Sequence, residues 1–207
     1  MNDVRAHYDR LIDENNDPVL DPPELKAYMD LWDGQDFIDR MALAPDKKVL
    51  EIGVGTGRLA VHAAPRCGEF YGVDLSEKTL IRAREHLGHL PHVHLICGDF
   101  LSCDLPMDFD VIYSSLTFMH IPEKQAAISK AAALLKKGGR FLLSLDKNPS
   151  PVIDMGTWQL PVFPDDPGQI RGCLMAADLE IREAYETEMA HIFLAVRPEI
   201  SAAESDN

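Results

Sequence analysis

A short apolar run, a glycine-rich turn and a second apolar run follow one another in Val49-Leu50-Glu51-Ile52-Gly53-Val54-Gly55-Thr56-Gly57-Arg58-Leu59-Ala60. The first run is typical of a buried strand, and the second begins a small helix. Glycine is needed where the backbone takes a positive φ angle or where a ligand lies against the main chain. Because free backbone amides also converge at such a turn, the segment predicts a binding site for a small cofactor.

The turn departs from the fingerprint of dinucleotide-binding proteins. That fingerprint, G-x-G-x-x-G/A, places a small residue at position 58, where this chain has Arg58. Glu51 would repel a pyrophosphate, but it would attract an ammonium group or another positive centre. The pattern E-x-G-x-G-x-G at 51–57 resembles motif I of the class I S-adenosylmethionine-dependent methyltransferases. The cofactor of that family carries an amine and a sulfonium and has no phosphate.

Composition narrows the class of protein. The chain has 207 residues, 46% of them hydrophobic, which suits one domain with a substantial core. No apolar run is long enough to cross a membrane, and the first residues lack the pattern of a signal peptide. The four cysteines form no C-x-x-C pair, so we expect a reduced, cytoplasmic setting and no membrane partner. A net charge of −14 argues against a nucleic-acid partner.

Residues 1–46 are expected to form a helical N-terminal arm. Apolar residues share one helical face between Val4 and Ile12, and a second pattern runs from Leu25 to Met41 with an interruption at Gly34. The arm carries 12 acidic and 4 basic residues. This acidity is either a solvated face or the mark of a lid whose charge suits a cationic or amine substrate.

Acidic residues follow two of the predicted strands. Asp74 ends the strand 69–74 and lies 21 residues after Gly53, about where nucleotide-binding α/β folds place the acid that binds the ribose. The alternative is that Asp74 caps the next helix, although Ser76 could do so instead. Asp99 likewise follows a predicted strand, at 93–97.

The resemblance assigns roles to these residues. It implies that the methionine portion of the cofactor is held by Glu51, Gly53, Gly55 and Gly57, that the ribose and one adenine face are taken by Asp74 and Leu75, and that the adenine is taken by Asp99 and Phe100. It further implies that Ser114 closes the site. From the arm, Tyr8 and Trp32 are expected to cover the cofactor.

The fourth predicted strand, Phe109 to Leu116, resembles motif IV of the family, without the Asp/Asn-Pro-Pro-aromatic signature of the DNA amino-methyltransferases. His120 follows its exit, and histidine is well suited to accept a proton near neutral pH. We therefore name His120 as the candidate base, with a structural role as the alternative. Four further histidines at 86, 89, 92 and 94 are interpreted as structural, because Pro91 interrupts them and no other ligand joins at zinc spacing.

The last third of the chain carries information about topology. The pattern L-K-x-G-G-x-x-x-x-S at 135–144 resembles the segment that leads into the family's fifth strand. We expect this strand to begin at Arg140. The proline-rich stretch 146–167 is expected to be irregular and to serve as a substrate lid. Only about five residues separate the predicted strands 179–185 and 191–196, so the two must be antiparallel. This excludes the all-parallel dinucleotide sheet.

Together these features predict an α/β three-layer sandwich with a seven-stranded mixed sheet, the Rossmann-like methyltransferase fold, whose last strand is antiparallel. The domain spans 47–200, after the arm at 1–46 and before a flexible tail at 201–207. The expected activity is transfer of a methyl group from S-adenosylmethionine to a small-molecule acceptor, with no metal. A cofactor-binding module with little catalysis and a protein methyltransferase remain alternatives, and a nicotinamide oxidoreductase is disfavoured. The acceptor and the oligomeric state are left open.

Overall fold

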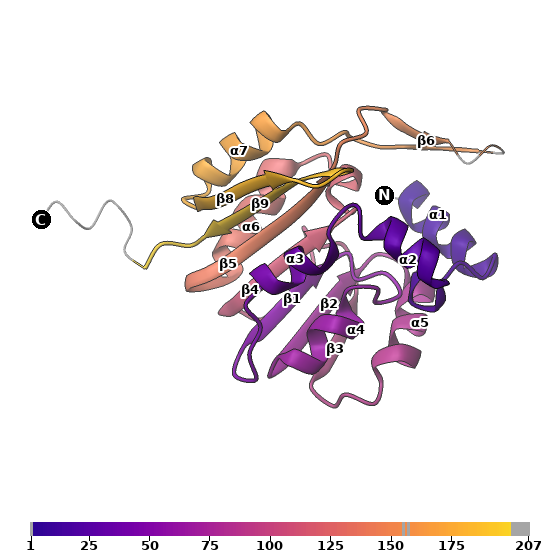
Figure 1. Ribbon diagram of the computed structural model, residues 1–207, viewed down its shortest axis with the longest axis horizontal. Helices are drawn as coiled ribbons and strands as arrows, with labels where there is room; N and C mark the ends of the chain where they lie inside the picture. The colour runs from indigo at the N-terminus through magenta and orange to yellow at the C-terminus, as the bar shows by residue number, and fades with distance from the viewer. Residues whose placement is uncertain (1, 155, 157, 200–207) are drawn as a thin grey trace, which may run out of the picture.

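A seven-stranded sheet forms the centre of the computed structural model, which describes residues 2–154, 156 and 158–199 (Figure 1). The predicted tail 201–207 lies outside these residues. The strands are β1 Lys48–Ile52, β2 Glu69–Asp74, β3 Val93–Cys97, β4 Phe109–Ser115, β5 Leu135–Asp146, β8 Glu180–Glu186 and β9 Ala190–Val196. Their order in the sheet is β3-β2-β1-β4-β5-β9-β8. β1 to β5 are parallel, whereas β9 runs antiparallel between β5 and β8, which confirms the predicted mixed sheet.

Helices cover both faces of the sheet, because the central strands are buried on both sides. Val49 and Leu50 of β1 are each fully buried yet belong to different core clusters. One face packs against helices α3 Gly34–Arg40, α4 Ala60–Ala63 and α5 Glu77–Leu87; the other packs against α6 Lys124–Leu134 and α7 Pro167–Ala176. Near-continuous apolar runs are the expected signature of such doubly covered parallel strands. The result is the predicted three-layer sandwich.

Local capping explains where two of these helices begin. Ser76 accepts a hydrogen bond from the Thr79 amide at 3.1 Å, and this side chain caps α5. Asp166 accepts from the Gln169 amide at 2.6 Å ahead of Pro167, the first residue of α7. Ser76 therefore caps α5, one of the two alternatives that the sequence left open. The neighbouring Asp74 is available for other contacts.

The arm forms helices where the apolar periodicity predicts them. Besides α3, it contains α1 Asn2–Asp13, a 3₁₀ turn Pro18–Leu20 and α2 Pro23–Met29. Figure 1 shows α1 and α2 beside α5 at one end of the sheet. Phe37 and Met41 are fully buried against the sheet, so the end of the arm is part of the main core. Within the described ranges, no helix is both long and apolar enough to cross a membrane.

Two expectations about the second half of the chain are wrong. β5 begins at Leu135 rather than at Arg140, because Leu135 already pairs with Phe109 before an irregularity in the register. The stretch expected to be irregular contains a hairpin of β6 Val152–Asp154 and β7 Gln159–Pro161. This hairpin forms a sheet of its own, and Figure 1 shows it extending beyond the main body near α1.

Candidate cofactor and acceptor site

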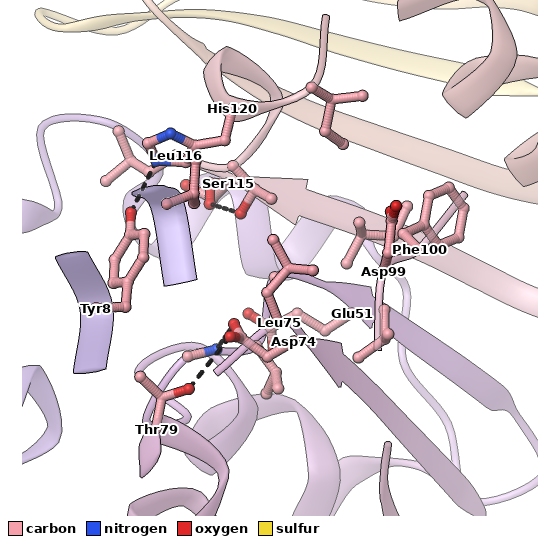
Figure 2. Close-up of a pocket in the computed structure, with 18 of the residues that line it drawn as sticks. Tyr8, Glu51, Asp74, Leu75, Thr79, Asp99, Phe100, Ser115, Leu116 and His120 are labelled. Carbon is pink, nitrogen blue, oxygen red and sulfur yellow. Dashed lines mark hydrogen bonds between the residues drawn. The ribbon is translucent and has the colours of Figure 1, made fainter. Parts of the chain in front are cut away.

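A cavity of about 520 Å³ lies at the carboxyl ends of the parallel strands, beneath the arm (Figure 2). Open α/β sheets bind their ligands at this edge, and the volume is that of a pocket for one or two small molecules. The strand-end residues in its lining are Glu51 and Ile52 of β1, Val73 and Asp74 of β2, Gly98 and Asp99 after β3, and Ser115 of β4. Three carboxyl groups from successive segments of the chain thus converge on one space.

The glycines of the turn serve different purposes. Gly53 has φ +79°, and a Cβ at this position would lie 2.0 Å from Oγ1 of Thr117. Gly55 has φ +55°, and no atom lies within 4 Å of the place its Cβ would take. The first glycine therefore lets the β4 exit approach, while the second leaves open space in the cavity wall. Gly57 packs toward Leu87 of α5 and is not part of the lining.

Asp74 is fixed by the turn and by α5. Its Oδ2 accepts from the Gly55 amide at 2.9 Å, and its Oδ1 accepts from the Ser76 amide at 2.9 Å and from the Thr79 hydroxyl at 3.2 Å. Burial raises the pKa of this carboxyl, although these hydrogen bonds favour the ionised form. A carboxylate held in this way presents a defined acceptor to hydroxyl groups in the cavity.

Glu51 is almost completely buried at the end of β1, with an exposed fraction of 4%. The Tyr113 hydroxyl donates to its Oε2 at 2.8 Å. Burial raises the pKa of Glu51 to about 8, even though the Tyr113 hydrogen bond and the nearby Arg58 lower it. A buried carboxyl of this kind would be stabilised as an anion by a cationic ligand.

The wall next to β2 and β3 combines acidic and apolar groups. Asp99 accepts from the Leu101 amide at 2.9 Å, a contact that orients its carboxylate after β3. Leu75 and Phe100 line the same cavity, and Phe100 is 5% exposed. A flat apolar ring could lie between such side chains while its polar edge reaches the carboxylate.

The exit of β4 differs from the prediction by one residue. Ser114 is 1% exposed and donates to the Ile52 carbonyl at 2.9 Å, so it ties β4 to β1 and is not part of the lining. Successive strand residues face opposite sides, and it is Ser115 that reaches the cavity. Leu116, also in the lining, has φ +55°, a strained conformation for a branched side chain that is often found at functional sites.

Tyr8 and His120 meet at the opposite side of the cavity. The Tyr8 hydroxyl lies 2.9 Å from Nε2 of His120, and Figure 2 shows the tyrosine pointing toward the imidazole. Burial lowers the pKa of His120 to about 4, helped by the charges of His7 and Lys124. Nδ1 of His120 is buried and has no hydrogen-bond partner among the described residues. The imidazole is therefore neutral at physiological pH.

The arm and the hairpin together cover the cavity. The ring centroids of His7 and Trp158 are 4.5 Å apart, and the Arg10 guanidinium lies 5.4 Å from the Trp158 ring. A small apolar cluster joins α1 to the hairpin and to the β4 exit; its buried members are Val4, Met119, Leu160 and Val162. We call these two segments, α1 and β6–β7, the roof.

Several acidic residues of the arm dock it onto the domain. Asp9 accepts a hydrogen bond from the Ser76 hydroxyl at 2.6 Å, and Asp13 accepts one from Lys78 at 2.6 Å. Asp17 lies 2.8 Å from His86, and Asp33 accepts from Arg58 at 3.0 Å. These carboxylates therefore contact groups of α5 and of the glycine turn. Asp3, by contrast, lines the cavity. Four of the twelve acidic residues of the arm thus hold it onto the domain.

Most of the predicted site residues come together in the lining, which contains Tyr8, Glu51, Gly53, Gly55, Asp74, Leu75, Asp99, Phe100 and His120. Gly57, Ser114 and Trp32 do not belong to it, and the Trp32 indole instead donates to Asp146 at 3.0 Å. Thr56 and Arg58 also line the cavity, but the sequence analysis did not name them as site residues, although both lie in the glycine turn. Asp33 had no distinguishing signal among the other arm acids.

Three of the four clustered histidines have separate surroundings. His86 binds Asp17, His92 lies 2.9 Å from the Ala64 carbonyl, and His94 stacks on Tyr71. In the described part of the chain, no group of three or more His, Cys, Asp or Glu side chains is arranged so that it could hold a metal ion.

Comparison with known proteins shows which families and structures the chain resembles. Residues 49–139 match a family model described as a methyltransferase domain. An uncharacterized methyltransferase of Anoxybacillus flavithermus is 37% identical over 123 residues, which are 58% of this chain and 57% of the relative. A ubiquinone biosynthesis O-methyltransferase of Dechloromonas aromatica is 35% identical over 118 residues, 55% of this chain and 51% of the relative. The chain thus spans only about half the length of these curated relatives.

A likeness in fold extends further than the likeness in sequence. The crystal structure of a SAM-dependent methyltransferase from Aquifex aeolicus matches with a TM-score of 0.69 at 18% identity, covering 87% of this chain and 98% of that one. Residues 49–139 are thus similar to a methyltransferase domain, and the chain has the fold of S-adenosylmethionine-dependent methyltransferases of known structure.

Proposed function

We propose that this protein transfers a methyl group from S-adenosylmethionine to a small, largely apolar acceptor. The observation that carries the proposal is the convergence of Glu51, Asp74 and Asp99 on one roofed cavity at the strand ends. Each carboxyl suits one feature of the cofactor: a positive group at Glu51, the ribose hydroxyls at Asp74 and the adenine amino group at Asp99. The match of residues 49–139 to a methyltransferase domain supports the same cofactor.

The cavity wall fits that cofactor in two further respects. Oγ1 of Thr56 is buried and has no hydrogen-bond partner among the described residues, although Thr56 lines the cavity. An orphaned buried hydroxyl is costly unless a ligand supplies its partner. The open space at Gly55 allows a ligand to lie directly against the backbone of the turn. Leu75 and Phe100 would enclose the adenine.

The bound cofactor would supply an electrophilic methyl group on a sulfonium. The contribution of the protein is to align the acceptor and to exclude water, which the roof and the apolar wall achieve. His120 is the candidate proton acceptor, and Tyr8 is the hydroxyl through which a proton would reach Nε2. A weak base is sufficient here, since a neutral nucleophile becomes strongly acidic once it has been methylated.

The charges of the lining restrict the acceptor. Among the described residues that line the cavity, Arg58 is the one Lys or Arg side chain, and it is already paired with Asp33. Apolar side chains line the same cavity as His120, including Leu116, Ile121 and Phe163. This environment favours an acceptor without negative charge. The name of the O-methyltransferase relative supports an oxygen nucleophile.

Calorimetric titration with S-adenosylhomocysteine, with NADH and NADPH as controls, tests the cofactor. Micromolar binding of S-adenosylhomocysteine alone is expected, and binding of a nicotinamide instead would overturn the proposal. Methyl transfer is then followed with a panel of neutral phenols, amines and carboxylates of matched size. Tight cofactor binding without turnover of any of them would favour the alternative of a binding module with little catalysis.

A further inference from the structure

Lys124 is a buried lysine at the start of a helix. It is the first residue of α6, and its side chain is 4% exposed. A cation is unfavourable in the first turn of a helix, and a lysine is seldom buried unless it is paired. The requirements of α6 itself therefore do not explain an ammonium group at this place.

The ammonium of Lys124 joins two segments that lie outside α6. Its Nζ donates to the Phe118 carbonyl, to the Phe163 carbonyl at 3.0 Å and to Oδ1 of Asp165, whose side chain is 2% exposed. These three acceptors use all three N–H groups of an ammonium. Phe118 begins the 3₁₀ turn that ends at His120, whereas Phe163 and Asp165 follow strand β7 of the roof. One side chain thus ties the turn of the candidate base to the segment that leaves the roof.

The backbone joins the same two segments. The Phe163 amide donates to the carbonyl of Met119, the middle residue of the turn, at 2.7 Å. Because Nε2 of His120 lies 2.9 Å from the Tyr8 hydroxyl, a shift of the turn by about 1 Å would break that hydrogen bond. The ammonium and the backbone bond together therefore determine where Nε2 lies.

We propose that Lys124 is a positioning residue, which holds His120 in place for proton transfer by fastening its turn to the segment after the roof. This assignment rests on the proposed function and deepens it. Buried ion pairs such as Lys124–Asp165 add little to stability, and their best-attested use is to select one geometry. Lys124 makes the position of the candidate base depend on the docked roof.

The sign of the electrostatic effect separates position from charge. Burial is the main cause of the low pKa of His120, and the charges of His7 and Lys124 contribute to it. Loss of the ammonium would by itself make His120 a stronger base. A lower kcat without the ammonium would thus reflect a misplaced imidazole rather than weaker basicity.

The test replaces the ion pair with apolar residues of similar shape, in Lys124→Met/Asp165→Leu. Such a replacement often preserves stability, whereas removal of one partner leaves the other charge buried and unpaired. The substrate is the member of the acceptor panel that wild-type protein methylates fastest. We expect kcat to fall about 10- to 100-fold, the effect of a misplacement of about 1 Å, while the affinity for S-adenosylhomocysteine stays within about 3-fold.

Two comparisons distinguish positioning from a general structural role. In the His120→Gln background the double replacement should lower kcat by less than about 2-fold, because Lys124 acts through His120. Lys147→Met is the matched control. Lys147 also bridges a carboxylate, that of Glu186 at 2.8 Å, and a carbonyl, that of Thr187 at 2.7 Å, but it does not line the cavity. Its kcat should equal that of wild-type protein, and thermal melting establishes that each variant is folded.

An NMR measurement tests the geometry without turnover. The ring centroids of Tyr8 and His120 are 5.5 Å apart, so wild-type protein should show a nuclear Overhauser effect between the two rings. The double replacement at Lys124 and Asp165 should abolish this effect, and Lys147→Met should retain it.

The outcomes separate the inference from the proposed function. If wild-type protein methylates no member of the panel, the proposed function fails, and the NMR comparison alone decides the inference. If the double replacement retains the contact between the rings, or lowers kcat equally with and without His120, Lys124 has only a structural role and the inference is wrong.

Discussion

Tyr8 and His120 form a hydrogen bond of 2.9 Å across 112 positions of the sequence. Tyr8 comes from α1 near the start of the chain, and His120 from a 3₁₀ turn after β4. The pair exists only while α1 is docked over the strand ends, so the candidate base and the roof are parts of one assembly. The first prediction addresses this link.

Replacing the Tyr8 hydroxyl should impair turnover more than cofactor binding. Tyr8→Phe removes the group that contacts Nε2 of His120, and we expect kcat to fall about 10-fold with a larger loss, about 100-fold, in His120→Gln. The affinity for S-adenosylhomocysteine should stay within about 2-fold. Tyr28→Phe serves as the control, because Tyr28 is an exposed tyrosine of the same arm. A kcat unchanged in both Tyr8→Phe and His120→Gln would assign the pair a structural role.

The pKa of His120 predicts a dependence of stability on pH. In the folded protein this pKa is lowered to about 4 by burial, from 6.5 when unfolded. The unfolded chain therefore binds more protons between these values, and stability is lost as pH falls from about 6.5 to about 4. Wild-type protein should lose up to about 3 kcal/mol more than His120→Gln over this window, as measured by urea unfolding. Parallel pH profiles for the two proteins would contradict the buried neutral state.

Glu51 should couple cofactor binding to proton release. Its pKa of about 8 in the free protein leaves it mostly protonated at pH 7, and a cationic ligand beside it would lower that pKa. Binding should therefore release a proton near pH 7 and tighten as the pH rises toward 8. Titration of S-adenosylhomocysteine in phosphate and in Tris, whose ionisation enthalpies differ, measures the release. Glu51→Gln should release no proton on binding. An equal release in both proteins would show that another group is the source of the proton.

Asp74 should contribute to affinity and to folding at once. Asp74→Ala is expected to weaken binding of S-adenosylhomocysteine by roughly 1–3 kcal/mol, because ribose hydroxyls would lose their acceptor. It should also lower the melting temperature, since the Gly55 and Ser76 amides lose their partner. Thr79→Val removes a hydrogen bond to the same carboxylate but leaves the carboxylate in place. Unchanged affinity in Asp74→Ala would remove the ribose assignment.

The contact between α1 and the hairpin should limit cofactor release if the roof is a lid. Arg10 lies over Trp158 at 5.4 Å, and Arg171 makes a similar contact with Phe193 at 5.5 Å, away from the cavity. Arg10→Ala should raise the dissociation rate of S-adenosylhomocysteine roughly 3-fold and Trp158→Ala up to roughly 10-fold. Stopped-flow displacement measures both, with Arg171→Ala as the control. Equal dissociation rates in all proteins would show that the roof contributes only packing and does not limit cofactor release.

Prediction from sequence succeeded where the signal is local. Apolar periodicity located α1 and α5, and the positive φ angles of Gly53 and Gly55 follow from the turn that those glycines imply. It failed at Leu135, where pairing with Phe109 prolongs the strand through a lysine–glycine segment. Of the two serines that end β4, the sequence analysis named Ser114, whereas Ser115 lines the cavity, because the sequence does not specify which side of the strand faces it.

The sequence by itself determined the sheet, its antiparallel end and the place of the candidate cofactor site, since each depends on short-range chemistry or on the length of a connection. Only the tertiary structure decided which partners the arm residues meet at the candidate site. Asp33 meets Arg58 across 25 positions and Tyr8 meets His120 across 112, and no periodicity links either pair. The physical reason is that these polar contacts form between residues far apart in the sequence, and the packing of the arm against the strand ends determines their partners.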